Sequence, residues 1–225
     1  LLIPGHISSL DKVVEILHHD LFQQLYPDSI YGQESGGFPD DIPSLKYEDF
    51  VKFHQKFYHP SNAYLYFYGD GDIEKHLQYL DESYLSHFDF LDVNSTIESQ
   101  KSFEQMVTYH NVYPLSGEEN EEEKDYLALG YVLGDTPVYS DLLAFDILTN
   151  ILLGDNSSPL KKALLDLNIC KDVDFSYSSA LKQPYFAIVL KNTDQSQAKI
   201  ILETIQKTLT QLVEDGIDPR DVQAG

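Results

Sequence analysis

The apolar positions of this chain follow two periods, and the helical period is the more extensive. Apolar residues three and four positions apart over residues 8–25 predict an amphipathic helix that packs on a sheet or another helix; they are Leu10, Val13, Val14, Leu17, Leu21 and Leu25. The same spacing predicts helices over residues 140–153 and 196–215. We expect Gly154 to end the first of these as a left-handed cap, and Gly216 follows the second.

The strand period occurs mainly in the last third of the chain. Residues 126–133 read as a strand, and apolar and polar residues alternate over residues 173–177 and 185–190. Gln183-Pro184 precedes the last of these, so the pattern predicts a hairpin or adjacent antiparallel strands. Ser158-Pro159 joins a capping residue to a proline suited to the first turn, which predicts a short helix there.

The stretch from residue 25 to residue 70 predicts a loop, a helix and a strand in close succession. Glycines and prolines mark residues 32–43 as turn-rich, and Ser44 is placed to cap a helix. His59-Pro60 ends that helix, because the residue before proline is disfavoured in the helical region. Residues 63–68 are apolar or aromatic throughout, which predicts a strand covered on both faces. Asp72 then caps another helix.

The pattern weakens between these regions and predicts a linker. Residues 91–124 are largely polar; residues 106–113 alternate loosely as a strand would, and residues 118–124 (EENEEEK) form an acidic run. We therefore expect one domain over residues 1–90, an acidic linker with one strand over 91–124, and a second domain over 125–225.

Composition narrows the classes of partner. The 225 residues carry 37 acidic and 15 basic side chains, a formal net charge of -22. Nucleic-acid binders need a basic surface that releases counterions, so the charge argues against that class. It permits basic peptides as partners, although solubility alone explains an acidic surface.

The remaining features of the whole sequence concern where in the cell the protein is located. The apolar runs are too short to cross a bilayer, and the first residues have neither the charged flank nor the length of a signal peptide. The one cysteine, Cys170, excludes an internal disulfide and suits a reducing compartment. With no basic cluster beside it in sequence, Cys170 is best interpreted as a small buried side chain.

Two series of short motifs give the chain a family resemblance. The first lies between residues 26 and 70 and comprises Tyr26-Pro27, Tyr31-Gly32, Ser35-Gly36-Gly37, Ile42-Pro43, Phe53-His54, Tyr58-His59-Pro60-Ser61-Asn62 and Tyr68-Gly69-Asp70. The second comprises NSSPLKKALL at 156–165, QPYF at 183–186, Leu190-Lys191 and GIDPRDVQA at 216–224. In this order they resemble the presequence-protease branch of the pitrilysin/insulinase zinc peptidases. The resemblance implies an α+β fold of two pitrilysin-like units, each a mixed or antiparallel sheet with helices on one face, the first incomplete at its N-terminal side.

The resemblance also implies zinc chemistry, but not for these residues. Such peptidases bind zinc through His-x-x-Glu-His and a distal Glu, and the motif Glu acts as general base on water. This chain contains no His-x-x-Glu-His, and Leu2 stands where the distal Glu is expected. We therefore assign no catalytic residue and no metal ligand, leave substrate-binding residues unknown, and expect zinc in the intact family enzyme but none in this chain.

Other candidate ligands each have a simpler interpretation. Glu15 and His19 are four apart and can share a helix face, but no convincing third zinc ligand lies nearby. Asp70-Gly71-Asp72 suggests calcium, yet Lys75 and Asp81 occupy the positions where a calcium-binding EF-hand loop has Gly and Glu.

Two histidines and a serine complete the candidates. His54 lies on an aromatic helix side, where a buried, hydrogen-bonded histidine is favoured over a ligand. His59 stands at a helix end, where an imidazolium can interact with the terminal carbonyls. Ser35 lies in a Ser-Gly-Gly turn that follows no strand, so it does not resemble a nucleophile elbow.

The resemblance implies that this chain is a fragment of a larger enzyme. The intact protein is expected to be an intracellular zinc oligopeptidase that degrades unfolded peptides in an enclosed chamber; the fragment's partners are those peptides and the remaining domains of the same polypeptide, with no nucleic acid or membrane. The location expected is the cytoplasm, or the mitochondrial matrix in a eukaryote. Two alternatives stay open: a non-catalytic peptide-binding homologue that lost its metal site, and a structural subunit of a heterodimer.

Overall fold

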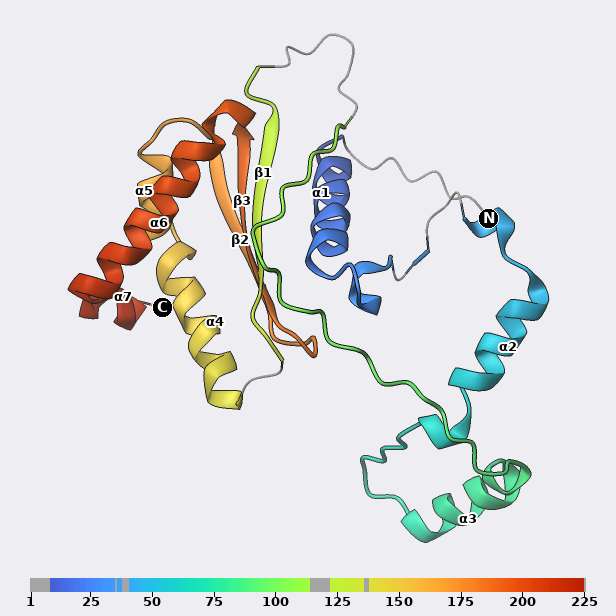
Figure 1. Ribbon diagram of the computed structural model, residues 1–225. Coiled ribbons are helices and arrows are strands. Elements are labelled where there is room, and N and C mark those ends of the chain that lie inside the picture. The colour runs from blue at the N-terminus through green and yellow to red at the C-terminus, as the bar shows by residue number, and fades with distance from the viewer. Residues whose placement is uncertain (1–8, 35, 38–40, 114–121, 136–137, 225) are drawn as a thin grey trace. The chain divides into compact units, whose positions relative to one another are not determined.

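The chain folds into two units, which are described separately (Figure 1). The computed structural model describes residues 9–34, 36–37, 41–113, 122–135 and 138–224. The sheet unit lies within residues 1–33 and 98–225, and the helical unit within residues 34–97.

The sheet unit is built on three antiparallel strands. These are β1 (Asp125–Val132), β2 (Asp172–Ser178) and β3 (Tyr185–Thr193), in the order β1-β3-β2. Ile188 of β3 stands opposite Leu129 of β1 and Phe175 of β2, which places β3 in the centre. The strands predicted over residues 126–133, 173–177 and 185–190 are confirmed, as is the antiparallel pairing of the last two.

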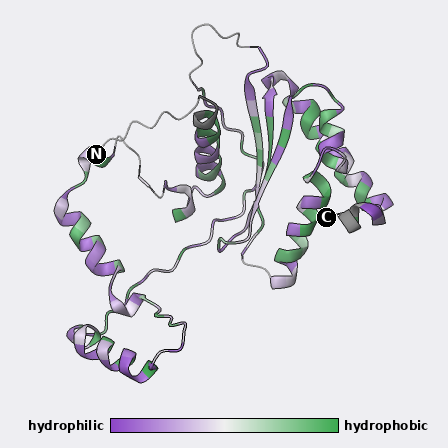
Figure 2. Ribbon diagram, turned by 180° about the vertical axis from the view of Figure 1, so that it is seen from behind, coloured by the Kyte–Doolittle hydropathy of each residue, from purple (hydrophilic) through white to green (hydrophobic). Residues whose placement is uncertain are grey.

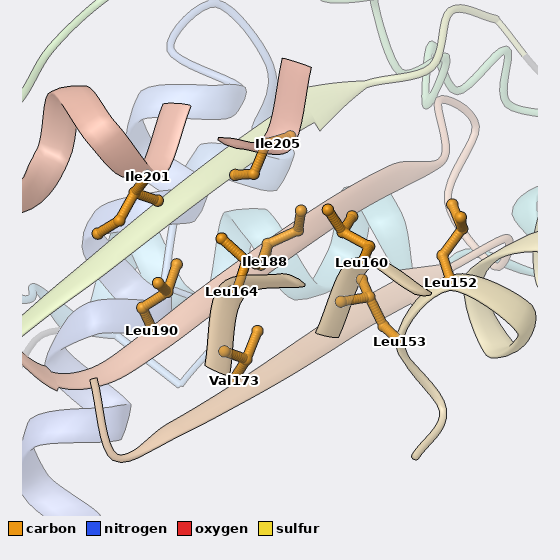
Figure 3. Close-up of a cluster of buried hydrophobic side chains, with 9 residues drawn as sticks. All are labelled: Leu152, Leu153, Leu160, Leu164, Val173, Ile188, Leu190, Ile201 and Ile205. Atoms are coloured by element: carbon orange, nitrogen blue, oxygen red, sulfur yellow. The ribbon is translucent and has the colours of Figure 1, made fainter. Parts of the chain in front are cut away.

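Helices from the last third of the chain cover one face of this sheet. They are α4 (Tyr139–Leu153), α5 (Pro159–Leu165) and α6 (Ala198–Asp215), and α7 (Pro219–Ala224) follows them. Their buried side chains meet those of the strands in one cluster (Figure 3): Leu152, Leu153, Leu160, Leu164, Val173, Ile188, Leu190, Ile201 and Ile205. α4 is hydrophobic over most of its length (Figure 2), and its C-terminal half enters this core.

The opposite face of the sheet is covered by α1 (Ser9–Leu25), so helices lie mainly, but not exclusively, on one face of this sheet. Leu25 and Tyr26 pack against Tyr185 and Ala187 of β3. Successive side chains of a strand point to opposite faces. Because β3 is apolar on both of its faces, each face needs a cover. At Gly130 of β1 a Cβ would lie 2.8 Å from a Leu21 methyl group, so glycine permits the close approach of α1.

The helical unit contains α2 (Tyr47–Phe57) and α3 (Ile73–Ser83). Asp72 caps α3 as predicted, since its carboxylate accepts a hydrogen bond from the Lys75 N–H at 3.2 Å. Ser44 does not cap α2: it ends the 3-10 turn Ile42–Ser44, and its hydroxyl donates to the Asp41 carbonyl instead. Short 3-10 turns also lie at Ile30–Gly32, Pro60–Asn62, Leu85–His87 and Gln195–Gln197.

Two predicted strands are not formed. Residues 63–68 and 106–113 belong to no strand, and the large side chains from Tyr64 to Tyr68 are exposed. A strand is stabilised by its neighbours, and the described residues pair no other strand with either segment. Gly154 is a further correction. It has right-handed helical angles rather than a left-handed cap, and it is needed because a Cβ there would lie 2.5 Å from the Asn150 carbonyl oxygen.

Candidate functional site

The pair predicted to share a helix face, Glu15 and His19, lies on α1, and among the described residues it belongs to no group of three or more possible metal ligands. Glu15 is exposed, whereas His19 is half-buried. The His19 Nδ1 atom lies 3.3 Å from an Asp20 carboxylate oxygen, and its Nε2 atom lies 3.1 Å from the Gln23 amide nitrogen. The second Asp20 oxygen accepts a hydrogen bond from the Asn111 amide at 2.7 Å. These neighbours form a polar network on the helix surface.

The two candidate histidines of the helical unit lie apart from any metal-ligating group among the described residues. His54 is exposed on α2 and stacks on Tyr58 with ring centroids 4.6 Å apart, so the expected burial of this histidine is wrong. Phe50 and Phe53 of the same helix are exposed as well, so the described residues provide no buried environment for the ring. His59 Nδ1 accepts a hydrogen bond from the Ser61 N–H at 3.2 Å. His59 is thereby the N-cap of the 3-10 turn Pro60–Asn62.

The other candidates hold no reactive arrangement. Cys170 is half-buried, and burial, followed by the nearby Asp172 carboxylate, raises the pKa of its thiol, which opposes thiolate formation. Asp72 serves as the helix cap, and hydrogen bonds from Lys75 lower the pKa of its carboxyl. Ser35 and Leu2 lie outside the described residues.

The residues described here do not fit a zinc site. No group of three or more His, Cys, Asp or Glu side chains in that part of the chain is arranged to hold a metal ion. Zinc requires at least three protein ligands in its catalytic sites. No step of a metal-dependent reaction is therefore assigned to these residues.

A buried polar network joins Tyr26, Gln183 and Gln100 in the sheet unit. Tyr26 is fully buried, and its hydroxyl donates to the Gln183 carbonyl oxygen at 2.7 Å. The Gln183 amide in turn pairs with the backbone of Gln100, accepting from its N–H at 2.5 Å and donating to its C=O at 3.0 Å. This reciprocal pair resembles the pairing of two strands and satisfies all four polar groups.

The network extends to the turn after α1. The Gln100 amide accepts from the Asp28 N–H at 2.8 Å and donates to the Asp28 carboxylate at 3.1 Å. The Tyr31 hydroxyl accepts from the Lys182 N–H at 3.0 Å. Three segments far apart in sequence are thereby fixed together, namely residues 26–31, residue 100 and residues 182–183.

The chemistry of this network is structural. Burial, followed by the neighbouring Tyr185 and Tyr31, raises the pKa of the Tyr26 hydroxyl well above its ordinary value of 10.0, so the phenol stays neutral and donates its proton. The motifs of the sequence included Tyr26, Tyr31 and Gln183 without assigning them a role. Gln100 carried no signal at all, because it lies in a polar segment without periodicity and acquires its partners only through the fold.

The fold and these residues together define a class: an α+β domain with two packed sheet faces and, within the described residues, no group that holds a metal. No helix in the same part of the chain is both long and apolar enough to span a bilayer. Residues 44–225 match the family model described as the peptidase M16 inactive domain. The chain belongs to the M16 peptidase family, as the resemblance to pitrilysin-type peptidases predicted.

Curated relatives match nearly the whole chain. It is 41% identical over 220 residues to protein HypA of Clostridium perfringens, an alignment that covers 98% of this chain and 22% of the relative. It is 37% identical over 206 residues to presequence protease 1, chloroplastic/mitochondrial, of Arabidopsis thaliana, covering 90% of this chain and 19% of that protein. The chain thus spans about a fifth of the length of these relatives.

Solved structures share the fold at low identity. An M16-like peptidase from Alicyclobacillus acidocaldarius superposes with a TM-score of 0.56 at 19% identity, over 96% of this chain and 50% of that chain. A protease from Helicobacter pylori gives 0.58 at 21% identity, over 92% and 49%. These likenesses support the α+β fold.

Proposed function

We propose that this chain is part of a longer zinc-dependent oligopeptidase that resembles presequence protease. In this proposal residues 1–90 are the rear half of a catalytic-type domain, residues 91–124 an acidic linker, and residues 125–225 most of a non-catalytic second domain, so that two pitrilysin-like units are represented. The observation that carries it is the alignment with Arabidopsis presequence protease 1, which takes in 90% of this chain and only 19% of that protein.

The role of the chain in that protein is to build the enclosure rather than to perform the hydrolysis. In this proposal the packed sheet unit, whose segments are joined by the Tyr26–Gln183–Gln100 network, forms part of the enclosing surface. The described residues do not fit a zinc site. Unfolded peptides are the proposed substrates of the intact protein, and its remaining domains are the proposed partners of this chain. A reducing compartment, either the cytoplasm or a mitochondrial matrix, belongs to the same proposal and suits the single cysteine.

Metal content and peptidase activity test the proposal. The chain alone and the whole polypeptide encoded by its gene are purified, and zinc is measured by elemental analysis beside a fluorogenic peptide assay. We expect about one zinc per catalytic site and peptide turnover in the whole polypeptide, and neither in the 225-residue chain. Stoichiometric zinc with turnover in the chain alone would refute the assignment of the chemistry to other parts of the protein.

A second candidate function is a non-catalytic homologue that binds peptides or another subunit. The matched family model, which is described as an inactive domain, is compatible with both functions. The two functions differ in what the gene encodes before Leu1. A His-x-x-Glu-His motif there supports the peptidase, whereas its absence, or obligate co-purification with a second subunit, supports the non-catalytic function.

A further inference from the structure

We propose that the Gln183 side chain is a clasp. Both ends of the helical unit are held at the sheet unit while the clasp is closed, and the entry end alone is held when it opens. The entry segment is residues 26–33 and the exit segment is residues 98–101; both belong to the sheet unit. The inference does not rest on the proposed peptidase function, because all of its residues lie in this chain.

The exit segment has a buried glutamine beside an exposed stretch. Residues 101–112 are all exposed, whereas Gln100 is 6% exposed. Across residues 98–109, the hydrogen bonds that join the chain to other described parts of the sheet unit all involve Gln100. Burial of a glutamine is costly unless its polar groups are hydrogen-bonded. The partners of Gln100 therefore explain why it is buried.

The Gln183 carboxamide supplies the pairing that a neighbouring strand would supply. Its oxygen accepts from the Gln100 N–H at 2.5 Å, and its nitrogen donates to the Gln100 C=O at 3.0 Å. Two such bonds to one residue are also what an antiparallel hydrogen-bonded pair exchanges. Gln183 is itself buried. Loss of its carboxamide would leave a buried N–H and a buried C=O without partners, which costs more than an ordinary hydrogen bond contributes.

The entry segment is held by other groups. The Tyr26 hydroxyl donates to the backbone carbonyl of Gln183 at 2.7 Å, and the Tyr31 hydroxyl accepts from the Lys182 N–H at 3.0 Å. Neither bond uses the Gln183 side chain. We therefore expect the entry segment to stay attached when the carboxamide is lost, whereas the exit segment is released.

The Gln100 side chain links the two segments. Its amide accepts from the Asp28 N–H at 2.8 Å and donates to the Asp28 carboxylate at 3.1 Å. When the clasp opens, Gln100 leaves this position, and the Asp28 N–H loses its partner as well. A change at Gln183 therefore reaches Asp28 through the movement of Gln100. This transmitted effect distinguishes a clasp from two independent contacts.

Amide exchange in the 225-residue chain, followed by nuclear magnetic resonance, tests the inference. Gln183→Met keeps a long, unbranched side chain and removes both of its hydrogen bonds. We expect the Gln100 and Asp28 amides to exchange at least about tenfold faster, while exchange at Leu190, in the central strand, stays within about twofold. Faster exchange at Gln100 alone, or unchanged exchange at both amides, would overturn the inference.

Gln100→Ala is the matched control. It removes the side-chain bonds to Asp28 and leaves the backbone pairing of residue 100 with Gln183 in place. We expect the Asp28 amide to exchange at least about tenfold faster and the amide of residue 100 to stay within about threefold of the unaltered protein. An amide of residue 100 that accelerates as much as in Gln183→Met would contradict the role of the carboxamide.

Gln183→Glu provides a readout that a packing role would not change, and it decides the question even where Gln183→Met disturbs the fold. The ionised carboxylate accepts from the Gln100 N–H but cannot donate to the Gln100 C=O, whereas the protonated acid can do both. Burial favours the protonated acid. We expect Gln100 exchange at least about tenfold faster than in the unaltered protein at about pH 7, and within about threefold of it at about pH 4.

The titratable groups around residue 183 do not produce this pattern. They are the hydroxyls of Tyr26, Tyr31 and Tyr185, the Asp28 carboxylate and the neighbouring Lys182. Tyrosine and lysine ionise well above about pH 7, and the Asp28 carboxylate is common to all the proteins compared at one pH. Accelerated Gln100 exchange in Gln183→Glu that is the same at both pH values would overturn the clasp.

Discussion

The sheet unit and the helical unit both contain amphipathic helices, yet only the sheet unit buries their apolar sides. Leu160 and Leu164 of α5 are 1% and 0% exposed, whereas Leu77 of α3 is 53% exposed and Phe53 of α2 is 57% exposed. No described residue of the helical unit reaches the buried class. The periodicity of a sequence therefore fixes which side of a helix is apolar, but burial depends on a complementary surface.

The difference shows where each unit obtains its stability. Burial of a valine, leucine or isoleucine side chain contributes about 1.5–3 kcal/mol, and the sheet unit has nine such side chains in one cluster. The helical unit depends on local interactions such as the Asp72 cap and the stacked pair of His54 and Tyr58.

Among the substitutions that test this contrast, the largest loss of stability is expected at Leu164. Leu164→Ala removes a fully buried side chain, and we expect the free energy of unfolding to fall by about 2–5 kcal/mol because a cavity is left in the core. Leu77→Ala makes the same chemical change on α3, where we expect less than about 0.5 kcal/mol. Urea unfolding followed by circular dichroism measures both. Equal losses for the two substitutions would contradict the division between a packed and an open unit.

A smaller effect is expected from two glycines that stand four residues apart. A Cβ at Gly32 would lie 2.4 Å from the Tyr26 carbonyl oxygen, which is backbone and cannot move aside. We expect Gly32→Ala to lower the free energy of unfolding by about 1–3 kcal/mol through overpacking.

Gly36→Ala is the matched control, because a Cβ there would meet only the end of the Glu34 side chain at 3.7 Å. We expect it to leave the free energy of unfolding within about 0.5 kcal/mol of the starting protein. Thermal and urea unfolding of the two variants provide the comparison. A neutral Gly32→Ala would show that the turn after α1 is loosely packed.

The sequence was sufficient to predict the elements whose partners lie nearby in the chain. The strands β1, β2 and β3 and the helices that cover one face follow from alternation and helical spacing, and the antiparallel pairing of β2 with β3 follows from the short connection at Gln183-Pro184. These predictions depend on local periodicity alone.

The features that sequence reasoning missed depend on distant partners. Residues 63–68 have the composition of a strand, but composition does not say whether a neighbouring strand is present. The position of α1 on the second face of the sheet depends on Gly130, which lies more than a hundred residues away from it in the sequence. Gln100 has no periodic neighbours, and only the fold brings it to Asp28 and Gln183.

The buried Tyr26 hydroxyl provides the next test. Tyr26→Phe removes the hydrogen bond to the Gln183 carbonyl, and we expect a loss of about 1 kcal/mol near neutral pH, measured by urea unfolding. Tyr64→Phe, on a side chain that is fully exposed, is the control and should change nothing. Should the two substitutions be equivalent, the network would not contribute to the stability of the sheet unit.

The raised pKa of Tyr26 predicts that the stability of the protein falls at alkaline pH. Because burial raises the pKa of Tyr26 above its ordinary value of 10.0, the unfolded chain ionises before the folded one. The contribution of the neutral Tyr26 phenol to the free energy of unfolding is complete below pH 10.0 and is lost as the pH rises above that value. The stability of Tyr26→Phe should therefore fall less between about pH 9 and pH 11. Burial also raises the pKa values of Tyr131 and Tyr177, so part of the alkaline loss persists in the variant.

The smallest effect is expected at the start of α3. Asp72→Ala removes the carboxylate that accepts from the Lys75 N–H, so the first turn of α3 should fray. Asp70→Ala removes the same charge two residues earlier, outside the helix, and is the control. Amide exchange at residues 73–76, followed by nuclear magnetic resonance, should accelerate only in Asp72→Ala.

Acid should reproduce this fraying in the unaltered protein. Hydrogen bonds from Lys75 lower the pKa of the Asp72 carboxyl from 3.8, so the cap is present above that value and is lost as the pH falls below it. The effect should remain in α3, because none of the described side chains of the helical unit is buried. If Asp72→Ala instead shifted the urea midpoint of the sheet unit, the stability of α3 would be coupled to the core of the sheet unit, and the contrast between the two units would fail.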